Sequence, residues 1–182
     1  RDVAPSRGLG DVYKRQNIKK VRVDKEGTGM GWGAVYAQYL ESMDQISGQG
    51  NGLSVSRQLY KGDEALNESA PLKVGDKITV RLTVKADRDM DFVQIKDDRA
   101  ACMEPLQAVS GFRWSNGLGY YQATKDASTQ FFIDQMRKGT YVIEYQVYVN
   151  RTGEYQAGIA TVQSAYAPEF GGHTGGYRVM VE

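Results

Sequence analysis

Hydrophobic and polar residues alternate most regularly between residues 141 and 149. The polar positions include Glu144 and Gln146, and the intervening positions are apolar or aromatic: Tyr141, Ile143, Tyr145, Val147 and Val149. Because successive side chains of a strand point to opposite faces, this pattern predicts a β-strand with one face in a core. The turn-forming sequence at 150–153 and a second strand-like stretch at 154–166 follow, so we predict a long antiparallel hairpin.

A second clean alternation occupies residues 77–85, where apolar residues alternate with charged residues and threonines. The two alternating stretches give a predicted core of Ile78, Val80, Leu82, Val84, Tyr141, Ile143, Tyr145 and Val147. Shorter strands are predicted at 17–23, 32–40, 53–60, 92–95, 120–123, 131–133 and 177–181. Many short strands separated by glycine and asparagine turns predict an all-β fold, an antiparallel two-sheet β-sandwich.

The chain is predicted to contain more than one segment type. Residues 1–16 show no periodicity and resemble a translated adapter at the end of a gene fragment, so we exclude them from fold reasoning. A natural flexible linker is the alternative. The sequence SGQGNG at 47–52 is the strongest linker signal. We therefore predict a strand segment of a preceding module at 17–47 and the β-sandwich domain at 53–182.

Composition excludes several classes of protein. The 23 lysines and arginines nearly balance the 22 aspartates and glutamates, giving a net charge of +1, which argues against a large nucleic-acid footprint. No apolar run approaches the roughly 20 residues that a transmembrane helix needs. Cys102 is the single cysteine, so the chain cannot form an internal disulfide.

Short motifs in a fixed order connect the chain with a known family. They are LKVGD at 72–76, FVQIKDDRAA at 92–101 with Glu104-Pro105 after it, GLGYY at 117–121, KGTY at 138–141 and YAPEF at 166–170. In this order they resemble the C-terminal MG10 domain of bacterial alpha-2-macroglobulins. GWGAVY at 31–36 resembles the strand before that domain. The resemblance implies a macroglobulin- or immunoglobulin-like sandwich, equivalent in position to the receptor-binding domain of the animal proteins.

The resemblance also implies a function and a location. Proteins of this family are large, exported and multi-modular, and they act as protease-trapping inhibitors or envelope-defence factors. The chain would then be a non-catalytic structural module in the periplasm or cell envelope. Its partners would be the neighbouring thioester and macroglobulin-like modules and, indirectly, a target protease. The alternative is a carbohydrate- or peptide-binding β-sandwich of an exported surface protein, and an enzyme is the third reading.

Cys102 is the first candidate for chemistry. The family forms its thioester within a Cys-x-Glu-Gln sequence, whereas here Pro105 stands in the place of the glutamine. Without the glutamine amide there is no acyl group for the sulfur to bond. We therefore predict that Cys102 is a small, buried and chemically quiet side chain.

Two further candidates concern metal and acid–base chemistry. The carboxylates Asp87, Asp89, Asp91, Asp97 and Asp98 lie close to basic residues, which predicts a solvated loop with strand-edge ion pairs rather than a cation site. His173 is the single histidine and lies in the glycine-rich sequence 171–176, predicted to be a flexible exposed loop. A lone histidine cannot build a histidine cluster for zinc. We assign no catalytic, cofactor-binding or metal-binding residue.

Aromatic side chains are the last candidate. They could line a groove for a glycan or a peptide, but we favour packing between sheets or between modules, since aromatic residues dominate cores and interfaces alike. The residues considered are Trp114, Tyr120, Tyr121, Tyr148 and Tyr166.

Overall fold

The structure is a computed model that describes residues 27–30, 48–67 and 70–182. The chain divides into two units, residues 1–39 and 40–182. The described residues of the second unit form β-strands and contain no helix, so none of them belongs to a membrane-spanning helix. The strands predicted at 17–23 and 32–40 lie outside the described residues.

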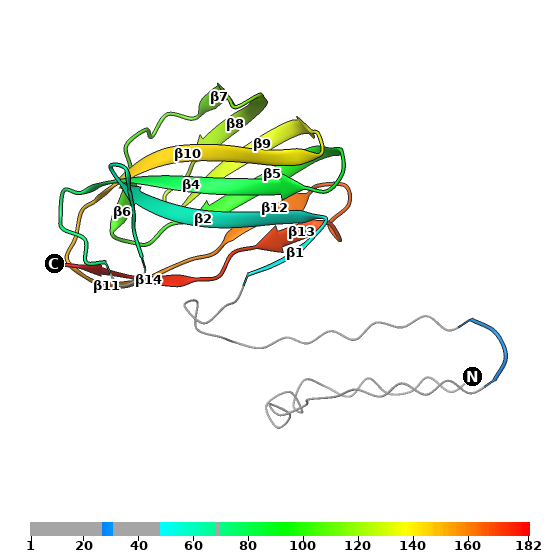
Figure 1. Cartoon of the computed structure of the whole chain (residues 1–182), viewed down its shortest axis with the longest axis horizontal. Helices are drawn as coiled ribbons and strands as arrows, with labels where there is room; N and C mark the ends of the chain where they lie inside the picture. Colours follow the sequence, from blue (N-terminus) through cyan, green and yellow to red (C-terminus); the bar gives the residue numbers. More distant parts are fainter. Residues whose placement is uncertain (1–26, 31–47, 68–69) are drawn as a thin grey trace. The chain divides into compact units, whose positions relative to one another are not determined.

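Two layers of antiparallel strands face each other (Figure 1). One layer contains β6 (Met103–Pro105), β10 (Gly139–Val149), β4 (Lys77–Ala86) and β2 (Leu53–Lys61), with the short β3 (Glu64–Ala65) beside β2. The other contains β13 (Gly171–His173), β12 (Ala160–Ser164), β5 (Met90–Asp98), β9 (Ser128–Met136), β8 (Leu118–Thr124) and β7 (Gly111–Ser115). β1 (Gln49–Asn51) joins the two layers, and β11 (Gly153–Ala157) pairs separately with β14 (Tyr177–Val181).

The core lies between the layers and matches the alternation in the sequence. β10 and β4 pair over ten residues, and this register puts Tyr145 opposite Val80 and Val147 opposite Ile78. Seven of the eight predicted core side chains are buried, and Tyr141 is half-buried against them. The predicted all-β sandwich and its core face are therefore confirmed.

The predicted hairpin of residues 141–166 is wrong. β10 pairs with β4 and β6, whereas β11 pairs with β14, and β12 pairs with β5 in the opposite layer. The turn after β10 thus leads into β11 of the separate two-stranded sheet, and the chain reaches the opposite layer only at β12. Alternation identifies the buried face of a strand but not the strand that pairs with it. The turn residues that suit a hairpin also suit a connection to another sheet.

The two glycine-rich segments expected to be a linker and a flexible loop form paired strands. β1 comes from the SGQGNG sequence, and it pairs with β13, which contains His173. A Cβ added to Gly172 would lie 2.7 Å from the carbonyl oxygens of Gln49 and Leu53. Glycine is therefore required here by the close approach of backbones, not by flexibility. The expectation of an exposed His173 loop is wrong: the side chain is half-buried, with Nδ1 3.0 Å from the Thr174 carbonyl oxygen.

Candidate functional site

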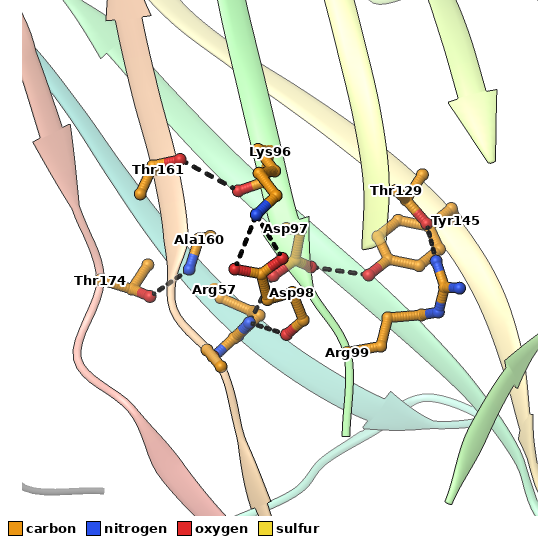
Figure 2. Close-up of polar contacts among 11 residues, drawn as sticks. Arg57, Lys96, Asp97, Asp98, Arg99, Thr129, Tyr145, Ala160, Thr161 and Thr174 are labelled. Atoms are coloured by element: carbon orange, nitrogen blue, oxygen red, sulfur yellow. Dashed lines mark hydrogen bonds and ion pairs between the residues drawn. The ribbon is translucent and has the colours of Figure 1, made fainter. Parts of the chain in front are cut away.

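A buried ion pair links the two layers (Figure 2). Arg57 comes from β2 and Asp97 from β5, and their side chains are 5% and 1% exposed. The guanidinium donates to one carboxylate oxygen of Asp97, and the Tyr145 hydroxyl donates to the other at 2.6 Å. Arg57 also donates to the Gly158 carbonyl and lies 4.5 Å from the centre of the Tyr177 ring. The prediction that Asp97 is solvated is therefore wrong.

The electrostatics of this cluster favour a structural role. Burial raises the pKa of Asp97, although Arg57 and the Tyr145 hydroxyl both oppose the rise. Desolvation also raises the pKa of Tyr145 well above its usual value. Each carboxylate oxygen of Asp97 accepts a hydrogen bond within the fold, and the side chain is 1% exposed, so a substrate in solution does not reach it. Among the described residues, no group of three histidine, cysteine, aspartate or glutamate side chains could hold a metal ion.

The buried tyrosines predict instability in alkali. Desolvation raises the pKa of Tyr177 as well as that of Tyr145, whereas tyrosines of the unfolded chain ionise near pH 10. Because only the unfolded state then gains from ionisation, their contribution to stability is complete below about pH 10 and declines above it. We expect Tyr145 alone to lower the free energy of unfolding by about 1.4 kcal/mol per pH unit above that point.

Denaturant unfolding between pH 8 and 12 measures this slope. Tyr145→Phe should make the slope shallower, although the variant is less stable throughout because it loses the bond to Asp97. Tyr166→Phe is the matched control, since Tyr166 is 79% exposed, and it should leave the slope unchanged. Equal slopes in wild type and Tyr145→Phe would contradict the prediction.

The other carboxylates of this region lie at the surface, as predicted. Ion pairs join Asp87 with Arg88 at 2.8 Å, Asp98 with Lys96 at 2.9 Å and Asp89 with Arg137 at 3.6 Å. Asp91 is exposed. Each of these carboxylates either forms one ion pair or is solvated. Such surface pairs contribute little to stability, and the carboxylates do not converge on a point where a cation could bind.

Arg99 is a buried polar residue that the sequence analysis missed. It directly follows β5, and its guanidinium donates to the Thr129 hydroxyl at 2.6 Å and to the Asp126 carbonyl at 2.9 Å. These bonds hold the turn between β8 and β9 against the end of β5, and Figure 2 shows the bond to Thr129. A basic residue among aspartates suggests pairing at the surface, so no feature of the sequence indicates this burial.

Cys102 is fully buried, which confirms its predicted placement. Burial raises the pKa of its thiol, and raised pKa values keep thiols protonated and unreactive. Pro105, which replaces the glutamine of the thioester sequence, lies in β6 opposite Val147 of β10.

We expect no thioester at Cys102. The intact mass of the chain should equal the mass of its sequence, without the loss of about 17 Da that ring closure with a glutamine amide would cause. Methylamine should release no thiol from the folded chain, whereas denaturation should expose the single thiol of Cys102. A mass loss located at Cys102 would contradict this expectation.

Exposed aromatic residues gather on the outer face of β7, β8 and β9. We call Phe112, Trp114, Tyr121 and Phe132 the aromatic face. Phe112 pairs with Tyr121 across β7 and β8 with ring centres 5.1 Å apart, and Tyr121 pairs with Phe132 across β8 and β9. They line a cavity of about 530 Å³. The exposed fractions of Phe112 and Trp114 are 83% and 76%.

Four of the five aromatic candidates from the sequence separate into three groups. Trp114 and Tyr121 belong to the aromatic face. Tyr120 is a core residue whose ring lies 5.7 Å from Phe131, and Tyr148 donates to Glu104 at another surface. Phe112 and Phe132 were not recognised, because single phenylalanines in a β protein usually predict core.

Tyr166 belongs to a second exposed aromatic contact, with Phe92 of β5. The two rings are 5.1 Å apart and edge to face. Phe92 has a φ of +53°, which is rare for an aromatic residue. This backbone reversal lets Met90 and Val93 both enter the core although they are three residues apart, and it turns the Phe92 ring outward. The strain therefore has a packing explanation.

Comparison with known proteins agrees with this architecture. The model of the family described as "Bacterial Alpha-2-macroglobulin MG10 domain" matches residues 52–169. The chain belongs to this family. The matched region of this MG10 domain includes the aromatic face, the Arg57–Asp97 pair and Cys102.

Solved structures of bacterial alpha-2-macroglobulins share the fold of this MG10 domain. The Salmonella protein reacted with methylamine is 19% identical with a TM-score of 0.63, and the similarity covers 75% of this chain and 10% of that one. The native Escherichia coli protein from domain MG7 to the C-terminus is 17% identical with a TM-score of 0.62, covering 74% and 24%. The MG10 domain thus corresponds to a small part of much larger proteins.

One curated protein is also similar in sequence. Circularly permutated Ras protein 2 of Dictyostelium discoideum is 28% identical over 181 residues, which cover 96% of this chain and 4% of that protein.

Proposed function

We propose that this chain is a non-catalytic structural and interaction module of a bacterial protease-trapping or envelope-defence protein of the alpha-2-macroglobulin family. The observation that carries the proposal is the contrast between its buried polar side chains and its exposed aromatic side chains. The buried polar group Asp97 is hydrogen-bonded within the fold, whereas the aromatic face is exposed at the surface. Such a contrast suits an interaction module better than an enzyme, which needs an accessible nucleophile or base.

The rest of the proposal follows from the family. Residues 53–182 are the domain, 17–47 belong to a preceding module, and 1–16 are a linker or a non-native scar. The complete protein is exported to the periplasm or envelope, where neighbouring modules carry the bait and thioester and this domain meets the protease only indirectly. The family match over 52–169 supports this arrangement.

The alternative, binding of a carbohydrate, needs flat rings that lie parallel to a sugar. The rings of Phe112 and Tyr121 are inclined by 74°, and those of Phe92 and Tyr166 by 80°. Edge-to-face pairs present ring edges as well as faces, so the surface does not form one stacking plane. We therefore favour a protein-facing role.

Sequencing the coding region upstream of residue 17 tests the proposal. It should encode a helical domain with a Cys-x-Glu-Gln sequence, in frame with residue 17. The protein extended to include that domain and the bait region should retain trypsin covalently after cleavage. Deleting residues 53–182 should lower this capture, whereas the Cys102→Ser variant should capture trypsin as the unchanged protein does. An upstream catalytic domain, or capture that depends on Cys102, would contradict the proposal.

A further inference from the structure

Strand β7 lies at the outer end of its layer, and no strand of the described residues pairs with its outer edge (Figure 1). It forms a hairpin with β8 through Asn116 and Gly117, both at positive φ, +50° and +76°. In such a two-residue hairpin the flanking pair, Ser115 and Leu118, is hydrogen-bonded, and bonded and non-bonded pairs alternate from there. The backbone N–H and C=O groups of Phe112 and Trp114 therefore point away from β8. In the described part of the chain, nothing hydrogen-bonds to them.

The two residues with free backbone groups are also the two most exposed members of the aromatic face. Trp114 lies against Gly119, where an added Cβ would come within 2.9 Å of the indole, so the ring is held over β8. Tyr121, Phe132 and the exposed Asp134 also line the open cavity beside it. Proline, a bulge or several charged residues usually protect an apolar edge strand of this kind from pairing with another chain. Strand β7 has only the charge of Arg113.

Arg113 gives this edge a charge preference. Its Nε donates to Gln122 at 3.2 Å and its Nη2 to the Val109 carbonyl at 3.4 Å, both long contacts. No ion pair to Arg113 is found among the residues that the structure describes. A strand added to β7 would therefore gain from a carboxylate opposite Arg113 and from apolar side chains next to it.

We propose that β7 is a docking edge for an extended segment of another protein, in which apolar residues flank an aspartate or glutamate. The backbone of the segment pairs with Phe112 and Trp114, one apolar side chain enters the cavity of the aromatic face, and the carboxylate meets Arg113. Strand addition of this kind takes its affinity from the main chain and its specificity from side-chain pockets. This inference goes beyond the proposed function and does not depend on it.

A second copy of the chain fits the edge less well. A symmetric antiparallel pairing of β7 with itself, centred on the free backbone groups, puts Phe112 opposite Trp114 and Arg113 opposite Arg113. Like charges directly opposite each other in a sheet are destabilising. The segment that complements β7 thus differs in sequence from β7, which points to another protein.

Selection from a library of randomised nine-residue peptides tests the proposal on the intact chain. Enriched peptides should alternate apolar residues with a central aspartate or glutamate. Binding of a single enriched peptide should shift the amide resonances of Phe112 and Trp114 and slow their hydrogen exchange. Enrichment without this pattern, no enrichment, or shifts located on other strands would overturn the proposal.

Variants distinguish strand addition from nonspecific hydrophobic binding to the exposed rings. Phe112→Pro removes an N–H that faces solvent, which an edge strand tolerates, and should weaken binding about tenfold or more. Phe112→Thr keeps the N–H and removes the ring, so it should weaken binding less. Arg113→Glu should reverse the preference toward basic peptides. Tyr166→Ser, an equally exposed aromatic away from β7, is the matched control and should bind normally.

Three outcomes would count against the proposal in these assays. Phe112→Pro could bind as tightly as the unchanged chain while melting at the same temperature. Sedimentation could reveal a dimer that Phe112→Pro dissociates, in which case a second copy takes the edge. Cellohexaose or chitohexaose could shift the same amides, in which case the aromatic face is a glycan site. If Phe112→Pro fails to fold, the Phe112→Thr and Arg113→Glu results decide.

Discussion

Replacing Asp97 with Ala should lower the free energy of unfolding by about 3–5 kcal/mol, because it leaves the buried Arg57 guanidinium without its counter-charge. Arg57 is 5% exposed, so water cannot take the place of the carboxylate. The Tyr145 hydroxyl loses its acceptor as well. Urea unfolding followed by tryptophan fluorescence measures the difference.

The neighbouring residue provides a matched control. Asp98 is 31% exposed and pairs with Lys96 at the surface, so Asp98→Ala should cost less than about 1 kcal/mol. The double variant Arg57→Met, Asp97→Leu removes both charges and should recover much of the loss, since a buried pair replaced by apolar residues is often nearly neutral. A loss below about 1 kcal/mol for Asp97→Ala would mean that the pair is solvated.

Sequence alone could predict the fold class and the buried face of the long strands. Alternation between Ile78 and Val84 and between Ile143 and Val147 carries this information directly, because the period of a strand is a local property. The partner of each strand is not local. The end of β10 shows this: the turn follows from local residues, whereas the strands that pair before and after it, β4 and β14, are distant in sequence.

The candidate site was harder to predict for a related reason. Asp97 and Asp98 are identical in type and adjacent, yet one is buried and the other reaches the surface, since successive side chains of β5 point to opposite faces. The buried position of Asp97 depends on Arg57, forty residues away. Likewise, glycine-rich segments such as 171–172 were interpreted as flexible, although the absence of a side chain served a close backbone contact.

Phe131 and Phe132 carry the second large effect, and they test the face assignment with one residue type. Phe131 is fully buried between the layers, 5.9 Å from the Tyr145 ring, whereas Phe132 is 38% exposed on the aromatic face. Phe131→Ala should lower the free energy of unfolding by about 3–5 kcal/mol, the usual result of removing a buried aromatic ring. Phe132→Ala should cost about 1 kcal/mol or less.

Urea unfolding of both variants, side by side, provides the comparison. The contrast between them arises only from the direction in which β9 turns each ring, since the side chains and the strand are the same. The Phe132→Ala variant should also weaken peptide binding at β7 while losing little stability, because its ring lines the cavity and lies outside the core. Equal losses of stability in the two variants would mean that a second layer covers the outer face of β9, and the aromatic face would then be a part of the core.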